Sequence, residues 1–124
     1  MTSLETLCAT TKGTKKIMLW ANKQGYTDVR TAWNNAPPKI RIKLALALSG
    51  FKQIDSILDF CLQYHKVARC GYQAVEFATS VYSLTYEDKH KAVKLAVGML
   101  GKTFRKDLAT WLLSDKSGFY SLLR

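Results

Sequence analysis

Apolar and polar residues alternate along most of the chain with the period of an α-helix. In the segment 51–66, apolar side chains recur at helical spacing at Phe51, Ile54, Ile57, Leu58 and Cys61. The polar residues Asp55, Asp59, Gln63 and Lys66 lie on the opposite face. This spacing gathers the apolar side chains on one side of a helix. Similar patterns at 71–82, 86–100 and 104–112 predict further helices through the second half of the chain.

Helix-capping residues divide the first third of the chain into short helices. Thr2 and Glu5 have the spacing of a capping box, in which each side chain binds the backbone of the other. Gly25 stands where a left-handed residue would end the next helix, and a third short helix is expected at 28–34. The prolines at 37–38 end that helix, and the second of them fits the first turn of another.

The segment 39–48 could form a strand or a helix. Its apolar residues alternate strictly, as in a half-buried strand, whereas Ala45 and Ala47 favour a helix. The preceding prolines and Gly50 decide for a helix that is apolar on most sides. The alternating residues are Ile40, Ile42, Leu44, Leu46 and Leu48.

Together these patterns predict an all-α fold. We expect a compact bundle of five to seven helices, with the helix at 40–48 buried in its centre. A chain of 124 residues has the usual size of one domain. We therefore expect residues 1–124 to form a single basic, all-helical domain.

The net charge of the chain suggests the class of its partner. It has 19 Lys and Arg against 9 Asp and Glu, a formal net charge of +10, while 48% of its residues are hydrophobic. That hydrophobic content is typical of a folded protein. A net charge of magnitude about 2 to 8 is enough for the solubility of a small domain. The excess therefore points to a polyanion, and RNA or single-stranded DNA is the partner that we expect.

The basic residues occur in clusters that could contact phosphates. Arg41 and Lys89 stand within these clusters as well. Tyr26 and Tyr72, each next to a glycine, are candidates for stacking on bases, whereas Trp20 is expected in the core. The candidate nucleic-acid-binding residues are Lys15, Lys16, Lys23, Arg30, Lys39, Lys43, Lys91, Lys94, Lys102, Arg105 and Lys106.

The sequence contains enough possible ligands for a metal site, but we do not expect one. Cys61, His65 and Cys70, with Cys8 or His90 as a fourth ligand, would suit zinc, yet the close pairs of cysteines typical of zinc modules are missing. Cys61 and His65 also complete an apolar face, which explains them as core residues. We expect no metal and no cofactor.

Motifs for catalysis are also missing, so we expect a non-catalytic protein. The sequence contains no phosphate-binding loop, nucleophile elbow or zinc-protease motif. The function predicted is binding to the phosphates of RNA or single-stranded DNA, as a small subunit of a ribonucleoprotein complex. The alternative is a protein-interaction module, an inhibitor or adaptor whose basic face docks an acidic partner. Exposed apolar residues in the tail would favour that alternative: Phe119, Tyr120, Leu122 and Leu123.

The location expected is intracellular, either cytoplasmic or nuclear. No signal peptide precedes the first predicted helix, and three cysteines without disulfide-like spacing suit a reducing compartment better than secretion. No lipid-anchor motif occurs, and no membrane partner is expected. Protein partners or a homo-oligomer are compatible with the sequence.

Overall fold

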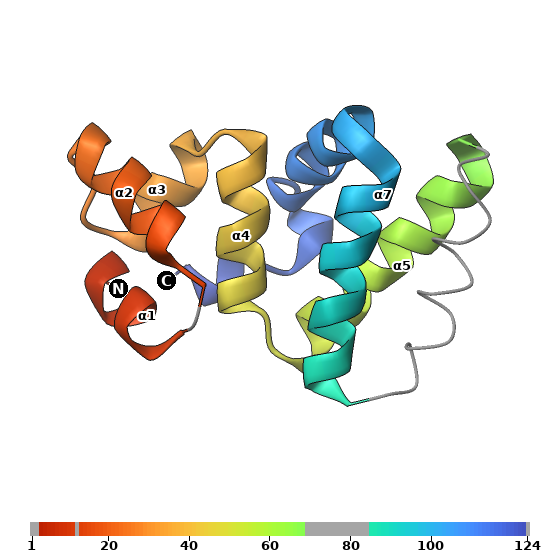
Figure 1. The fold of residues 1–124 in the computed structure, drawn as a ribbon, viewed down its shortest axis with the longest axis horizontal. Helices are drawn as coiled ribbons and strands as arrows, with labels where there is room; N and C mark the ends of the chain where they lie inside the picture. The colour runs from red at the N-terminus through yellow and green to blue at the C-terminus, as the bar shows by residue number, and fades with distance from the viewer. Residues whose placement is uncertain (1–2, 12, 69–84, 124) are drawn as a thin grey trace. The chain divides into compact units, whose positions relative to one another are not determined.

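The computed structural model describes residues 3–11, 13–68 and 85–123, in which helices are joined by short turns and an isolated β-bridge links Ser3 to Asp28 (Figure 1). The prediction of an all-α fold with five to seven helices is confirmed. The helix expected at 71–82 lies outside the described residues. No described helix is long and apolar enough to cross a membrane. The described helices are α1 (Leu4–Thr10), α2 (Lys15–Gln24), α3 (Val29–Asn35), α4 (Pro38–Leu48), α5 (Phe51–Ala68), α7 (Tyr86–Leu112) and the 3-10 helices η1 (Asp115–Ser117) and η2 (Tyr120–Leu122).

The chain divides into two compact units. Unit 1 comprises Met1–Leu48 and Ala109–Arg124, and unit 2 comprises Ser49–Leu108. By sequence, unit 1 has ten Lys and Arg against three Asp and Glu, a net charge of +7, and unit 2 has nine against six, a net charge of +3. Most of the charge excess therefore belongs to unit 1. A single domain over 1–124 stays a prediction.

Aromatic stacking joins the C-terminal tail to the core of unit 1. The rings of Trp33 in α3 and Phe119 are stacked with centroids 5.0 Å apart, and both side chains are fully buried. Leu123 is buried as well, whereas Leu122 is half-buried. Tyr120 is the exposed large hydrophobic residue of this tail, and its hydroxyl donates a hydrogen bond to the Leu113 carbonyl. Most apolar residues of the tail therefore belong to the core, so the exposed apolar tail that would favour a protein-interaction module is not present in the described residues.

Helix α4 supplies one face to the core of unit 1. Leu44 is fully buried and Ile42 nearly so. The other three alternating residues, Ile40, Leu46 and Leu48, are half-buried. In a helix, alternate residues lie 200° apart around the axis, so they cannot all face one core. The helix was predicted correctly, and its burial is confined to one face.

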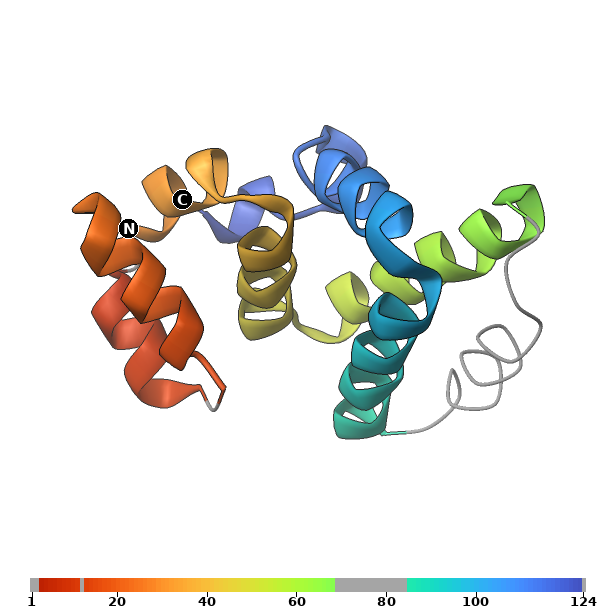
Figure 2. The same ribbon diagram turned by 45° about the horizontal axis from the view of Figure 1, so that its top comes forward.

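The core of unit 2 lies between α5 and α7. Phe104 of α7 is fully buried and packs edge-on against Tyr64 of α5, with ring centroids 5.0 Å apart. Thr85 caps the start of α7, because its hydroxyl accepts from the Asp88 N–H and donates to the Asp88 carboxylate. Gly101 has a φ of +83°, which breaks α7 into two halves that run in different directions (Figure 2). The helices expected at 86–100 and 104–112 are therefore the two halves of α7, which meet at the break at Gly101.

Two helix starts lie one residue from the expected position. Ser3 caps α1 by accepting a hydrogen bond from the Thr6 N–H at 3.1 Å. Thr2, the residue expected there, lies outside the described residues. Asp28 caps α3 rather than standing in its first turn, and it accepts from the Thr31 N–H at 3.2 Å. A Ser and an Asp satisfy free N–H groups in the same way as the expected residues.

Candidate nucleic-acid interface

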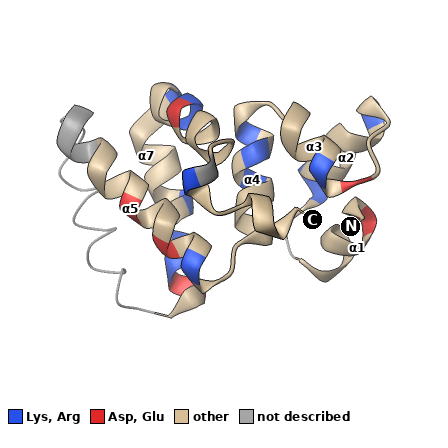
Figure 3. Cartoon of the chain, turned by 180° about the vertical axis from the view of Figure 1, so that it is seen from behind, with Lys and Arg blue, Asp and Glu red and all other residues tan. Residues whose placement is uncertain are grey.

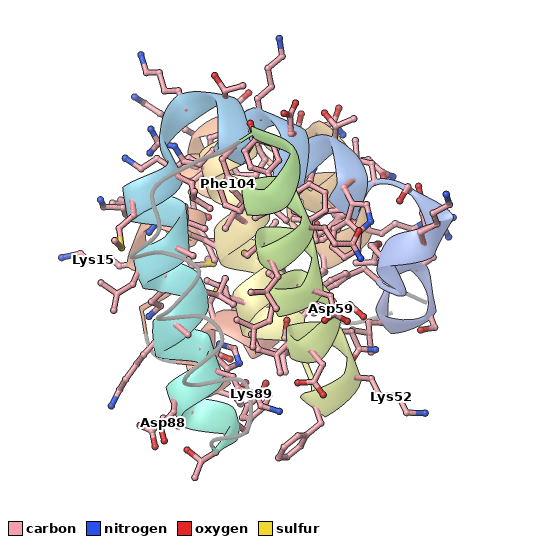
Figure 4. All side chains as sticks on the ribbon, turned by 90° about the vertical axis from the view of Figure 1, so that its right-hand side faces the viewer. Lys15, Lys52, Asp59, Asp88, Lys89 and Phe104 are labelled. Atoms are coloured by element: carbon pink, nitrogen blue, oxygen red, sulfur yellow. The ribbon has the colours of Figure 1, made fainter. Side chains whose placement is uncertain are left out.

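The exposed side of α2 combines basic and aromatic residues. Ile17 and Ala21 are buried and fix the side of α2 that faces the core. Leu19, on the opposite side, is 61% exposed, and Lys15 points outward (Figure 4). We call the residues on and beside this exposed side the α2 surface: Lys15, Lys16, Leu19, Trp20, Lys23 and Tyr26.

An aromatic pair borders the three lysines. The rings of Trp20 and Tyr26 are tilted against each other with centroids 5.3 Å apart, and both residues are half-buried. Trp20 lies four residues after Lys16 and three before Lys23, so these side chains are neighbours on the helix. Trp20 was predicted as a core residue, but it is half-buried and is not among the buried residues of the core.

The end of α2 positions Tyr26. Gly25 adopts a left-handed conformation with φ +77°, and its N–H donates to carbonyls of the last turn. The Tyr26 N–H donates to the Ala21 carbonyl at 2.9 Å. These bonds form the helix-ending motif that was expected at Gly25. The chain thereby turns back so that Tyr26 meets Trp20.

The helices α2, α3 and α4 contain no acidic residue, whereas α1, which contacts α2, contains Glu5. The helices α2, α3 and α4 together have seven Lys and Arg, and in Figure 3 α4 shows basic residues alone among its charged ones. Asp28 is the only carboxylate in residues 6–48. Hydrogen bonds from Thr31 hold the pKa of Asp28 below its usual value. This carboxylate therefore serves as the cap of α3, while the lysines of α2 have no ion pair within the described part of the chain.

Three further predicted residues belong to unit 1. Arg30 in α3 and Lys39 in α4 are exposed, and Lys43 in α4 is half-buried. Lys39 and Lys43 lie one turn apart on the same helix, as expected. They add to the positive charge of unit 1.

Arg41 has a structural position. It is 8% exposed, and its Nε donates to the Trp33 carbonyl at 3.0 Å, with Nη2 3.5 Å from the Asn34 carbonyl. These carbonyls belong to the last turn of α3, where the helix dipole favours a cation. Burial lowers the pKa of Arg41, but a guanidinium stays charged at neutral pH. Arg41 is therefore not available to contact phosphates, and Lys39 and Lys43 remain as the candidates of this cluster.

The remaining basic candidates lie on α7. Lys91, Lys94, Lys102 and Lys106 are exposed, and Arg105 is half-buried. Up to Leu108, α7 belongs to unit 2. The structure therefore divides the predicted set between the two units.

Lys89 of α7 is a structural residue as well. Its Nζ lies 2.7 Å from the carboxylate of Asp55 and 5.6 Å from the centre of the Phe51 ring. The Lys89 side chain is 10% exposed and lies between α7 and α5, whereas Lys52 points away from the ribbon (Figure 4). Lys89 thus joins the two helices of unit 2.

The cysteines are placed as core and partly buried thiols. Cys61 is buried, which raises the pKa of its thiol to about 12, and burial also raises the pKa of Cys8. A neutral thiol is a poor metal ligand. In the described part of the chain no three His, Cys, Asp or Glu residues gather around a possible metal. Cys70, the side chain of His65 and the stacking candidate Tyr72 lie outside the described residues.

Trp20 was not among the candidate site residues predicted from the sequence. In the sequence, Trp20 lies near the apolar residues Ile17 and Ala21 and one helical turn after Lys16. This spacing could have indicated a position at the border between the apolar and polar sides of the helix. The exposure of Trp20 depends on where the core contacts α2, and that is a tertiary property. Comparisons with known protein families, curated protein sequences and solved structures found no match to this chain.

Proposed function

We propose that this chain is a non-catalytic basic helical protein that binds RNA or single-stranded DNA, with the α2 surface as its main contact. The observation that supports this most is the half-buried aromatic pair of Trp20 and Tyr26 beside Lys16 and Lys23. Every base offers a flat face to an aromatic ring, and the neighbouring phosphates need cations. Aromatic rings bordered by lysines suit both needs.

Single strands fit this arrangement better than a duplex. In a duplex the bases are stacked on one another, so an aromatic side chain reaches them only after a base has been unstacked. The surrounding basic residues of unit 1, Arg30, Lys39 and Lys43, would extend the contact along the phosphates.

Contacts between lysine or arginine and phosphates hold the nucleic-acid backbone and do not distinguish one base sequence from another. A chain of this size without a base-reading motif would gain specificity from other subunits. We therefore propose that it works as a small subunit of a ribonucleoprotein complex. The competing inhibitor or adaptor function loses its expected support in the tail, where Phe119 and Leu123 are buried.

The replacement of Tyr26 by leucine tests the proposal. Tyr26→Leu removes a stacking ring and leaves all charges in place. Stacking on an aromatic side chain is worth about 1–3 kcal/mol per base, so we expect the affinity to fall roughly 5- to 160-fold. Fluorescence anisotropy with labelled oligouridine and oligothymidine measures the affinity.

The matched control is Tyr120→Leu, which removes the partly exposed tyrosine of the tail in the same unit. Circular dichroism verifies that both variants are folded. We expect the control to bind like the wild type. Unchanged binding by Tyr26→Leu, or an equal loss in the two variants, would rule out the α2 surface as a stacking site.

A further inference from the structure

Two large apolar side chains lie exposed one turn apart on α7. Leu95 is 48% exposed and Met99 is 50% exposed. Single exposed apolar residues are common and need no explanation. Residues four apart on a helix are neighbours, however, so Leu95 and Met99 form one continuous apolar patch.

The surface around this patch is open and basic. Lys91 lies one turn before Leu95, Lys94 lies beside it, and both lysines are exposed. Gly98 is exposed between the two apolar residues, and a Cβ placed there would meet nothing within 4 Å. The backbone of a partner could therefore approach α7 closely at Gly98. From residue 89 to 106 the helix has six Lys and Arg and no Asp or Glu.

We propose that this face of α7 docks an acidic amphipathic helix of a partner protein. The face consists of Lys91, Lys94, Leu95, Gly98 and Met99. Two apolar residues one turn apart match the spacing of apolar residues on a partner helix. The flexible side chain of Met99 adapts to such a surface, and carboxylates beside the partner's apolar stripe would pair with Lys91 and Lys94.

Charge complementarity selects this occupant. A second copy of the same face would bring Lys91 and Lys94 against like charges, which is unfavourable. Nucleic acid would meet the lysines but gain no stacking from Leu95 or Met99. An acidic amphipathic helix would match both parts of the face, because its apolar residues can pack on Leu95 and Met99 and its carboxylates can pair with the lysines. The proposal does not depend on nucleic-acid binding, because it concerns unit 2 and the α2 surface belongs to unit 1.

A designed peptide provides the probe. It has about three heptads with Leu at the a and d positions, Glu at e and g, and Ala elsewhere. A fluorescent label on the peptide allows anisotropy titration with the full chain. We expect Leu95→Gln and Met99→Gln each to weaken binding by roughly tenfold or more, since burial of one such side chain is worth about 1.5–3 kcal/mol.

Leu19→Gln is the matched control, because Leu19 is an exposed leucine between lysines on α2. We expect this variant to bind the peptide like the wild type. Three results would overturn the proposal: no binding by the wild type, an equal loss in Leu19→Gln, or equal binding of a peptide with Ser in place of Leu. A selective loss of oligouridine binding in Leu95→Gln would assign this face to nucleic acid instead and would also overturn it.

Discussion

At the scale of single residues, the position of a basic side chain determines its role. Arg41 and Lys89 belong to the same sequence clusters as the exposed lysines, yet both are largely buried. Arg41 donates to backbone carbonyls of α3, and Lys89 pairs with Asp55. Lysine and arginine are mostly exposed in proteins, so sequence alone favours the surface for each of them. The partners that bury these two residues come from other helices.

Replacement of Arg41 by methionine should destabilise the fold. The variant removes the donor from the buried Trp33 carbonyl while keeping an apolar side chain. A hydrogen bond to a charged group contributes about 1.5–3 kcal/mol, and we expect a loss of that size in the free energy of unfolding. Urea denaturation measures it.

Lys39→Met is the control, because Lys39 lies exposed on the same helix. It should change the free energy of unfolding by less than about 0.5 kcal/mol. Equal stability of the two variants would show that Arg41 is not needed as a cap of α3.

At the scale of helices, local sequence features were the most predictable part of the fold. The left-handed end at Gly25 and the proline start of α4 depend on neighbouring residues, and both are confirmed. Burial was less predictable. The half-exposure of Trp20 and of Leu46 depends on which side of a helix meets the core, and that is set by contacts with distant residues.

Gly25→Ala should destabilise the chain although no atom blocks the new methyl group. The φ of +77° puts Gly25 in the left-handed region, where an L-residue costs roughly 1–2 kcal/mol. We expect a lower free energy of unfolding by about 1 kcal/mol in urea.

Gly98→Ala provides the opposite case. Gly98 lies within α7, and a methyl group there would meet nothing within 4 Å. Alanine favours a helix over glycine, so we expect a gain of up to about 1 kcal/mol. A loss of stability in Gly98→Ala, or no loss in Gly25→Ala, would contradict the backbone conformations described for these two glycines.

At the scale of the whole molecule, the positive charge is unevenly distributed. Unit 1 has a net charge of +7 and unit 2 has +3. The total charge of the sequence predicted a polyanion partner. The structure shows which side of α2 is buried, and only this identifies α2 as a helix with lysines beside aromatic rings on its other side. The predicted set contained most of the α2 surface, namely Lys15, Lys16, Lys23 and Tyr26, and it missed Trp20.

The salt dependence of binding tests the central proposal most directly. Each phosphate contact on a single strand adds about 0.7 to the slope of log affinity against log salt concentration. Lys16→Gln with Lys23→Gln removes two exposed lysines beside the aromatic pair. Lys52→Gln with Lys116→Gln removes two exposed lysines that are not part of the α2 surface. All three proteins are titrated with labelled oligouridine over a range of salt concentrations.

We expect steep salt dependence in the wild type, a slope smaller by about 1.4 in the α2 pair, and no change in the control pair. Wild-type affinity that does not vary with salt, or an equal change of slope in both pairs, would contradict binding of nucleic acid at the α2 surface.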